Sequence, residues 1–167
     1  MKLRVYLEAN WEAVRLLLSI GDTYIPGAIY YRLTEMDFDD FVVKTFISKK
    51  LTAHENFKQF KEKVNRKDIK KMAKRMFKVA NDYAFIEHTV SKTFVLENWK
   101  TNIDDIDAFE KYLREEASIC IMLKSEDKLL PPTKGKENLE KALALYKKCG
   151  IGVKEFRFAY EEMRREK

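Results

Sequence analysis

The chain has 167 residues, with 33 Lys and Arg against 27 Asp and Glu, giving a formal net charge of +6. Hydrophobic residues make up 46% and charged residues 36%, which excludes an intrinsically disordered chain and suffices for one domain with a core. Only 5 Gly and 3 Pro are present, fewer than the many turns of a β-rich fold need. The composition therefore favours a single helical domain over residues 1–167.

The N-terminal segment carries Glu8, Glu12 and Arg15, and no uncharged stretch approaches the roughly 18 apolar residues of a membrane span. We therefore expect no signal peptide, no membrane association and a cytoplasmic location. Abundant Lys and Glu with a single Gln are typical of hyperthermophile proteins, with a Lys-rich mesophile as the alternative. Cys120 and Cys149 are expected to be reduced core thiols.

The predicted elements begin with a helix over residues 3–20, where apolar side chains recur at helical spacing until Gly21 ends the pattern. A second helix is predicted from Pro26 to about Lys50, because apolar residues surround it on several sides. Thr52 is the expected N-cap of a short helix that ends at Val64, with Glu55 completing a capping box.

The segment from Ile69 to Ala80 follows the i, i+3, i+4, i+7 rule, and we expect this helix to continue to Trp99. A further helix is predicted up to about Leu123. The loop over residues 125–137 is a candidate boundary before a C-terminal helical hairpin at 138–167. The expected fold is therefore all-α: a helical bundle of about six or seven helices with a C-terminal hairpin.

The main functional signal is a cluster of basic residues. Between Lys58 and Lys78 lie ten Lys or Arg residues and two acidic ones. Helical geometry places several of them opposite the apolar stripe, where a polyanion would release its counterions on binding. The alternative is a solvated face paired with acids elsewhere in the fold. Lys outnumbers Arg, which favours backbone binding over sequence readout. The candidate nucleic-acid-binding residues are Arg66, Lys67, Lys70, Lys71, Lys74, Arg75 and Lys78.

Four acidic residues, Glu35, Asp37, Asp39 and Asp40, have the density of a divalent-metal site such as metal-dependent nucleases use. However, Asp37 and Asp39 would point to different sides of a helix, and no second acidic pair supports them. We therefore favour a solvated face, or an intersubunit partner for the Lys-rich helix, and predict no metal.

Neither His54 nor His88 has a His or Cys neighbour at ligand spacing, so both are expected to be structural. The chain also lacks a Gly-rich phosphate loop, a nucleophile elbow and a Cys-x-x-Cys pair. The sequence accordingly predicts no catalytic residue and no cofactor, and it favours a binding protein over an enzyme. Most aromatic residues are expected in the core; those that can instead stack nucleobases or anchor a partner are Trp11, Trp99, Tyr24 and Tyr112.

Residues 8–57 resemble the HEPN family of helical-bundle domains. The matching pieces are the segment 12–18, Gly21-Asp22, Ala28 with Tyr30-Tyr31, and Thr52-Ala53-His54. The family's ribonuclease motif, an Arg followed four to six residues later by His, is missing. The resemblance implies a bundle that dimerises and does not cut RNA.

The expected function is a non-enzymatic basic helical protein that binds nucleic-acid backbone, or a nucleoprotein complex, through the Lys67–Lys78 helix face. DNA and RNA are not distinguished. The alternative is a protein–protein interaction or self-assembly module without nucleic-acid affinity, which includes a homo-oligomer. A metal-dependent or HEPN-like nuclease ranks third.

Overall fold

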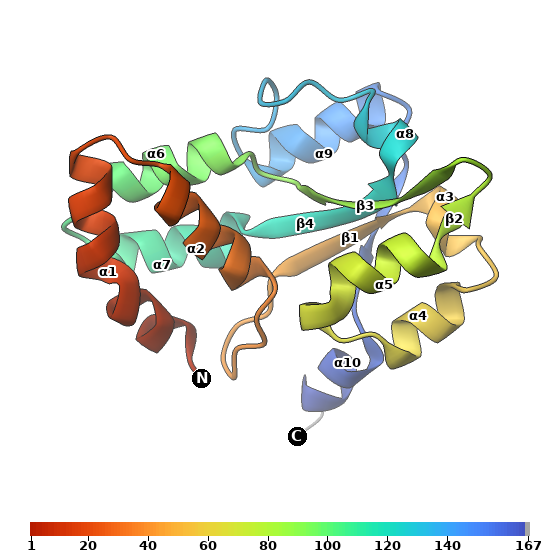
Figure 1. Ribbon diagram of the computed structural model, residues 1–167, viewed down its shortest axis with the longest axis horizontal. Helices are drawn as coiled ribbons and strands as arrows, with labels where there is room; N and C mark the ends of the chain where they lie inside the picture. The colour runs from red at the N-terminus through yellow and green to blue at the C-terminus, as the bar shows by residue number, and fades with distance from the viewer. Residues whose placement is uncertain (166–167) are drawn as a thin grey trace.

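The computed structural model describes residues 1–165 and shows a mixed α/β protein, so the prediction of an all-α bundle is wrong (Figure 1). Five strands form one sheet in the order β2-β3-β4-β1-β5. The parallel pair β1 and β4 lies in the middle, and the other neighbours are antiparallel. The strands are β1 (Lys44–Ser48), β2 (Lys78–Val79), β3 (Asp82–His88), β4 (Ser118–Leu123) and β5 (Val153–Phe156).

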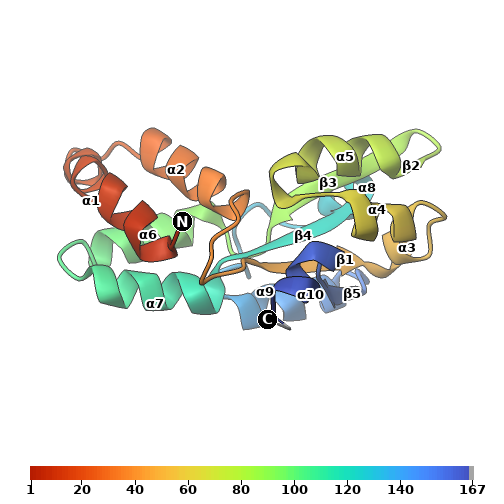
Figure 2. The same ribbon diagram turned by 90° about the horizontal axis from the view of Figure 1, so that it is seen from below.

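Four helices form a helical lobe beyond one end of the sheet: α1 (Leu3–Ser19), α2 (Tyr24–Thr34), α6 (Lys92–Thr101) and α7 (Ile106–Glu116). The other helices pack on or beside the sheet (Figure 2): α3 (Lys49–Thr52), α4 (Phe57–Lys63), α5 (Ile69–Met76), α8 (Lys124–Asp127), α9 (Leu139–Lys148) and α10 (Ala159–Arg165). The helices α4 and α5 cover one face of the sheet, and α9 packs on the other. A 3-10 turn at Arg66–Asp68 leads into α5.

The predicted first helix is confirmed as α1. Its buried residues are Leu3, Leu7, Val14 and Leu18, which follow the helical spacing of the sequence. Gly21 has φ of +81°, a conformation that a side chain would strain. The apolar stripe of α1 therefore packs inward, and the chain turns back directly into α2.

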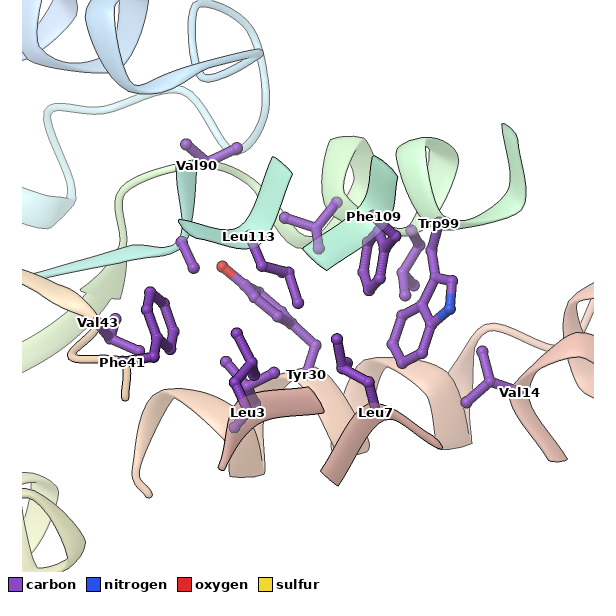
Figure 3. Packing of buried hydrophobic residues seen from close by; sticks show 14 of the residues in the cluster. Leu3, Leu7, Val14, Tyr30, Phe41, Val43, Val90, Trp99, Phe109 and Leu113 are labelled. Atoms are coloured by element: carbon purple, nitrogen blue, oxygen red, sulfur yellow. The ribbon is translucent and has the colours of Figure 1, made fainter. Parts of the chain in front are cut away.

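The core of the helical lobe is rich in aromatic side chains (Figure 3). Trp99 stacks on Phe109 with ring centroids 4.5 Å apart, and Trp11 contacts both rings. Tyr30 lies fully buried between α1 and α7, and its hydroxyl has no hydrogen-bond partner among the described residues. Trp11 and Trp99 are thus core residues of this lobe.

The sequence pattern predicted helices in place of the central strands β1 and β4, because most residues of these strands are buried. The predicted second helix ends at Thr34, and its last residues form β1; the predicted helix ending near Leu123 stops at Glu116 and is followed by β4. All six residues of β4 are buried. A short apolar run buried on both faces shows no two-residue alternation, so its pattern matches a buried helix equally well.

The helix predicted from Ile69 to Trp99 is four separate elements, α5, β2, β3 and most of α6. The first, α5, ends at Met76, and β2 and β3 follow as a hairpin joined by Ala80 and Asn81. Ala80 has φ of +53°, where Gly or Asn is usual. The common sequence signal for a tight hairpin was therefore absent.

The predicted C-terminal helical hairpin is half right. Its first helix is α9, with Ala142 and Tyr146 buried, but the next segment is β5. This strand pairs antiparallel with β1, so the chain after the 125–137 loop completes the same sheet.

Candidate nucleic-acid interface

The helix α5 presents Lys70, Lys71, Lys74 and Arg75 because its other side is anchored in the core, while Lys67 lies in the 3-10 turn before it and Lys78 on β2. Ile69, Ala73 and Phe77 are buried against the sheet together with Phe60 of α4. The polar side of α5 then faces solvent, since the buried positions recur every four residues. Six of the seven predicted residues are exposed: Lys67, Lys70, Lys71, Lys74, Arg75 and Lys78. These six residues are called the basic face below.

Arg66 does not belong to the basic face. Its guanidinium is 1% exposed and pairs with Glu161 of α10, with Nη2 2.7 Å from Oε1. It also donates through Nη1 to the Thr45 hydroxyl at 3.0 Å. Arg66 lies three residues before Ile69 and seven before Ala73, so helical spacing already placed it on the buried stripe. Arg66 is therefore a buried structural residue and not part of the candidate interface.

The two interpretations of the basic face differ in whether its charges are paired. Among residues 1–165, Lys70 forms an ion pair with Glu35 at the C-terminal end of α2. The other five residues of the basic face have no carboxylate within ion-pair distance in that part of the chain. Pairing with acids elsewhere in the fold therefore accounts for one of the six charges, and five are available to an external anion.

Aromatic rings lie next to the basic face, and the sequence did not reveal them. The Nζ atom of Lys74 lies 4.8 Å from the centroid of the Tyr83 ring on β3. The Nζ atoms of Lys70 and of Lys92, the first residue of α6, lie 5.8 Å and 5.6 Å from the centroid of the Tyr31 ring on α2. Four elements that are distant in sequence thus bring lysines and tyrosines together.

Gly27 makes room for Lys92. A β-carbon at this buried position of α2 would lie 2.8 Å from Cδ of Lys92. Glycine inside a helix costs about 1 kcal/mol relative to alanine, so its presence there has a packing reason. The backbone of α2 allows the aliphatic part of Lys92 to cross the helix on its way to Tyr31. An isolated Gly in a helical pattern was the one sequence signal of this close approach.

His88 lies beside the same lysines at the end of β3. Its ring stacks on Tyr31 with centroids 4.2 Å apart, and Nε2 is 3.3 Å from the Thr34 hydroxyl. That hydroxyl donates its proton to the Tyr31 carbonyl, so Nε2 of His88 must be the donor to Thr34. Burial, with the charges of Lys70 and Lys92, lowers the pKa of His88 from 6.5 to about 3. The ring is therefore neutral at physiological pH.

A groove runs between α5 and the outer edge of β3. Its volume is about 260 Å³, and it is lined by Lys70, Lys74, Tyr83, Ala84, Phe85 and Ile86. The strand β2 pairs with β3 only at Asp82 and Tyr83, so no other strand within residues 1–165 pairs with the outer side of residues 85–88. This space is called the edge groove below.

The acidic cluster is dispersed among different partners. Glu35 pairs with Lys70, Asp37 accepts from the Tyr160 hydroxyl, and Asp39 accepts from the amino group of Met1. Asp40 pairs with Arg114 of α7 and accepts from the amide of Leu3. No group of three His, Cys, Asp or Glu side chains in the described chain is placed to hold a metal ion. The four carboxylates instead connect neighbouring elements.

The remaining candidates from the sequence lie away from the edge groove. His54 accepts the amide of Asn56 through Nδ1 and packs edge-on against Phe77, a local structural role. Tyr112 stacks on Phe109 in the helical lobe, whereas Tyr24 is 81% exposed at its far corner. Both cysteines are free thiols, and burial raises the pKa of Cys120.

Comparison with known proteins gives no relative: no protein-family model, no curated protein and no solved structure matches the chain. The resemblance of residues 8–57 to HEPN domains accordingly stays a prediction. Within the described residues, no helix is both long enough and apolar enough to cross a membrane.

Proposed function

We propose that this protein binds the phosphate backbone of a nucleic acid through its basic face, without acting as an enzyme on it. The observation that carries the proposal is the surplus of exposed, unpaired charge on and next to α5. Five of the six side chains lack a carboxylate partner within residues 1–165, and Lys92 adds a further cation beside Lys70. Each lysine that contacts a phosphate releases condensed counterions, which supplies sequence-independent affinity.

Charge reversal tests this function directly. Lys70, Lys74 and Lys78 are replaced by Glu, and binding of labelled single-stranded and duplex DNA and RNA is followed by fluorescence anisotropy over a salt series. The wild-type affinity should fall steeply with salt, and the variant should lose binding while keeping its helical signal. Unchanged binding by the variant, or no binding by the wild type at low salt, contradicts the proposal.

A matched control uses the opposite side of the sheet. Lys134, Lys147 and Lys148 are exposed on α9 and the loop before it, and their replacement by Glu changes the net charge by the same amount. This control should retain most of the binding. Equal losses in the two triple variants would mean that total charge, rather than the basic face, determines the affinity.

Self-association is a second candidate, favoured by one apolar corner of the helical lobe. Leu16 and Ile20 lie one helical turn apart near the end of α1, and Tyr24 and Ile25 follow at the start of α2. These four side chains are exposed, with fractions from 45% to 81%. Exposed apolar side chains on neighbouring elements often mark an interface, here between two copies of the chain. Sedimentation velocity tests it: Ile20→Lys should dissociate a dimer, and a monomeric wild type excludes it.

A further inference from the structure

The tyrosine rings beside the basic face are placed to contact bases as well as phosphates. Tyr31 and Tyr83 are both partly exposed, and each has a lysine ammonium group over its ring. Lys70 and Lys74 also line the edge groove, together with Tyr83 and Phe85. Basic and aromatic side chains therefore lie together beside β3: Lys70 and Lys74 with Tyr83 in the edge groove, and Lys92 with Tyr31 next to His88 at the end of the strand.

We propose that the ligand of the basic face is a single-stranded nucleic acid that lies along the edge groove, with bases stacked on Tyr83 and Tyr31 and phosphates held by Lys74, Lys70 and Lys92. This proposal rests on the proposed function and names its substrate class. A positive groove with aromatic rings is the usual arrangement for binding single strands irrespective of sequence.

The energies favour exchange of lysine for a base on each ring. A base stacked on an aromatic side chain contributes more to the binding free energy than a cation over an exposed tyrosine. The flexible stem of a lysine allows its ammonium group to move outward to a phosphate. Each lysine thereby keeps an electrostatic partner while the ring gains a stacked base.

A duplex is a poorer ligand for the same site. The faces of its bases are covered by neighbouring base pairs, so stacking on Tyr83 would require a base to be unpaired, unstacked and flipped out. The backbone of β3 also favours an unpaired strand. The amide of Ala84 donates to the Phe77 carbonyl, on the side of β3 that faces away from β4. Backbone groups alternate in direction along a strand, so the amide and carbonyl of Ile86, two residues further on, also point away from β4 and toward the edge groove. They can hydrogen-bond to an exposed base.

The experiment compares three ligands of equal length: a labelled single-stranded oligoadenylate DNA, the corresponding abasic oligomer, and a duplex. Affinities are measured by fluorescence anisotropy with the wild-type protein and with Tyr83→Leu. Tyr83→Phe serves as the control that keeps the ring, and circular dichroism confirms that both variants fold.

Base stacking predicts that the oligoadenylate binds at least roughly fivefold more tightly than the abasic oligomer and the duplex. Tyr83→Leu should weaken oligoadenylate binding by roughly five- to a hundredfold, leave the abasic oligomer unaffected, and be rescued by Tyr83→Phe. Equal affinity for oligoadenylate and abasic oligomer, tighter binding of the duplex, or no effect of Tyr83→Leu overturns the single-strand proposal while backbone binding stands. Absence of binding to all three ligands overturns both.

Discussion

The guanidinium of Arg66 and the carboxylate of Glu161 lie 95 residues apart in sequence and form an ion pair within the core, with Nε 3.0 Å and Nη2 2.7 Å from Oε1. The pair joins the turn before α5 to α10, and Arg66 also contacts Thr45 on β1. Arg66 therefore holds α5 on the sheet, and the six residues of the basic face are exposed to solvent.

Removing one partner of this pair should destabilise the protein strongly. Arg66→Met leaves Glu161 buried without its cation, which costs about 3 to 5 kcal/mol in the free energy of unfolding. The double variant Arg66→Met with Glu161→Leu should recover much of that loss, because apolar residues then fill the site. Urea unfolding measures both, with the exposed Lys67→Met expected to stay within about 0.5 kcal/mol. A loss of unfolding free energy below about 1 kcal/mol for Arg66→Met would show that the ion pair contributes little to stability.

Lys136 should hold the long loop against the sheet. Its buried ammonium group pairs with Glu87 of β3, and its carbonyl accepts the amide of Ser91. Lys136→Met leaves Glu87 half-buried and unpaired, at a cost of about 1 to 3 kcal/mol at pH 7. Hydrogen exchange of the Ser91 amide should accelerate beyond the change in global stability. Lys134→Met, an exposed lysine of the same loop, is the control and should show neither effect.

The loss of stability caused by Lys136→Met should also depend on pH. Burial raises the pKa of Glu87, and removal of Lys136 raises it further. A carboxyl with a raised pKa in the folded state contributes stability only at low pH, when it is protonated. The stability difference between Lys136→Met and the wild type should therefore shrink from pH 7 to pH 5. A difference that is constant over this range contradicts the pairing of Lys136 with ionised Glu87.

His88 should make the protein less stable in mild acid. Its pKa of about 3 in the folded state lies below the unfolded value near 6.5, so only the unfolded chain binds a proton between these pH values. Stability from this group is complete above pH 6.5 and decreases by up to about 1.4 kcal/mol per pH unit below it. His88→Gln should show a shallower decrease of unfolding free energy between pH 7 and 5. An NMR signal of His88 that titrates near pH 6.5 would contradict this.

Gly27→Ala should reduce ligand affinity without unfolding the protein. The new β-carbon displaces Lys92 from its path across α2, while alanine favours the helix by about 1 kcal/mol. We expect a stability change below about 1 kcal/mol and a loss of oligonucleotide affinity equal to that of Lys92→Met. Gly152→Ala is the matched control, because its β-carbon would meet Cδ of Lys49 at 3.0 Å on a different part of the molecule. Equal effects of both glycine variants on affinity would refute a role for Lys92.

Ala80→Gly should stabilise the hairpin of β2 and β3. Ala80 has φ of +53°, a conformation that costs an L-residue roughly 1 to 2 kcal/mol and costs glycine little. Part of that gain is lost to the greater freedom of glycine in the unfolded chain, so we expect a net increase of about 1 kcal/mol. Ala53→Gly, at an exposed position with φ of −84°, should instead destabilise by about 0.5 to 1 kcal/mol. Thermal unfolding of the two variants measures the contrast.

The sequence alone determined the elements whose burial pattern is one-sided. The stripe of α1 and the amphipathic α5 with its lysines outward both follow from spacing along one helix. Such patterns are local, so neighbouring residues suffice to define them. The exposed members of the basic face could be predicted for the same reason.

Only the tertiary structure decided which segments are strands and which residues lie beside the basic face. Strands β3 and β1 pair with the two edges of β4, and helices cover both of its faces, so all six of its residues are buried. These residues therefore carry no alternation that distinguishes a strand from a helix. Tyr31, His88 and Lys92 likewise meet Lys70 through long-range packing of α2, β3, α5 and α6. No local periodicity records such contacts, because they arise from how separate elements bury their apolar surfaces against one another.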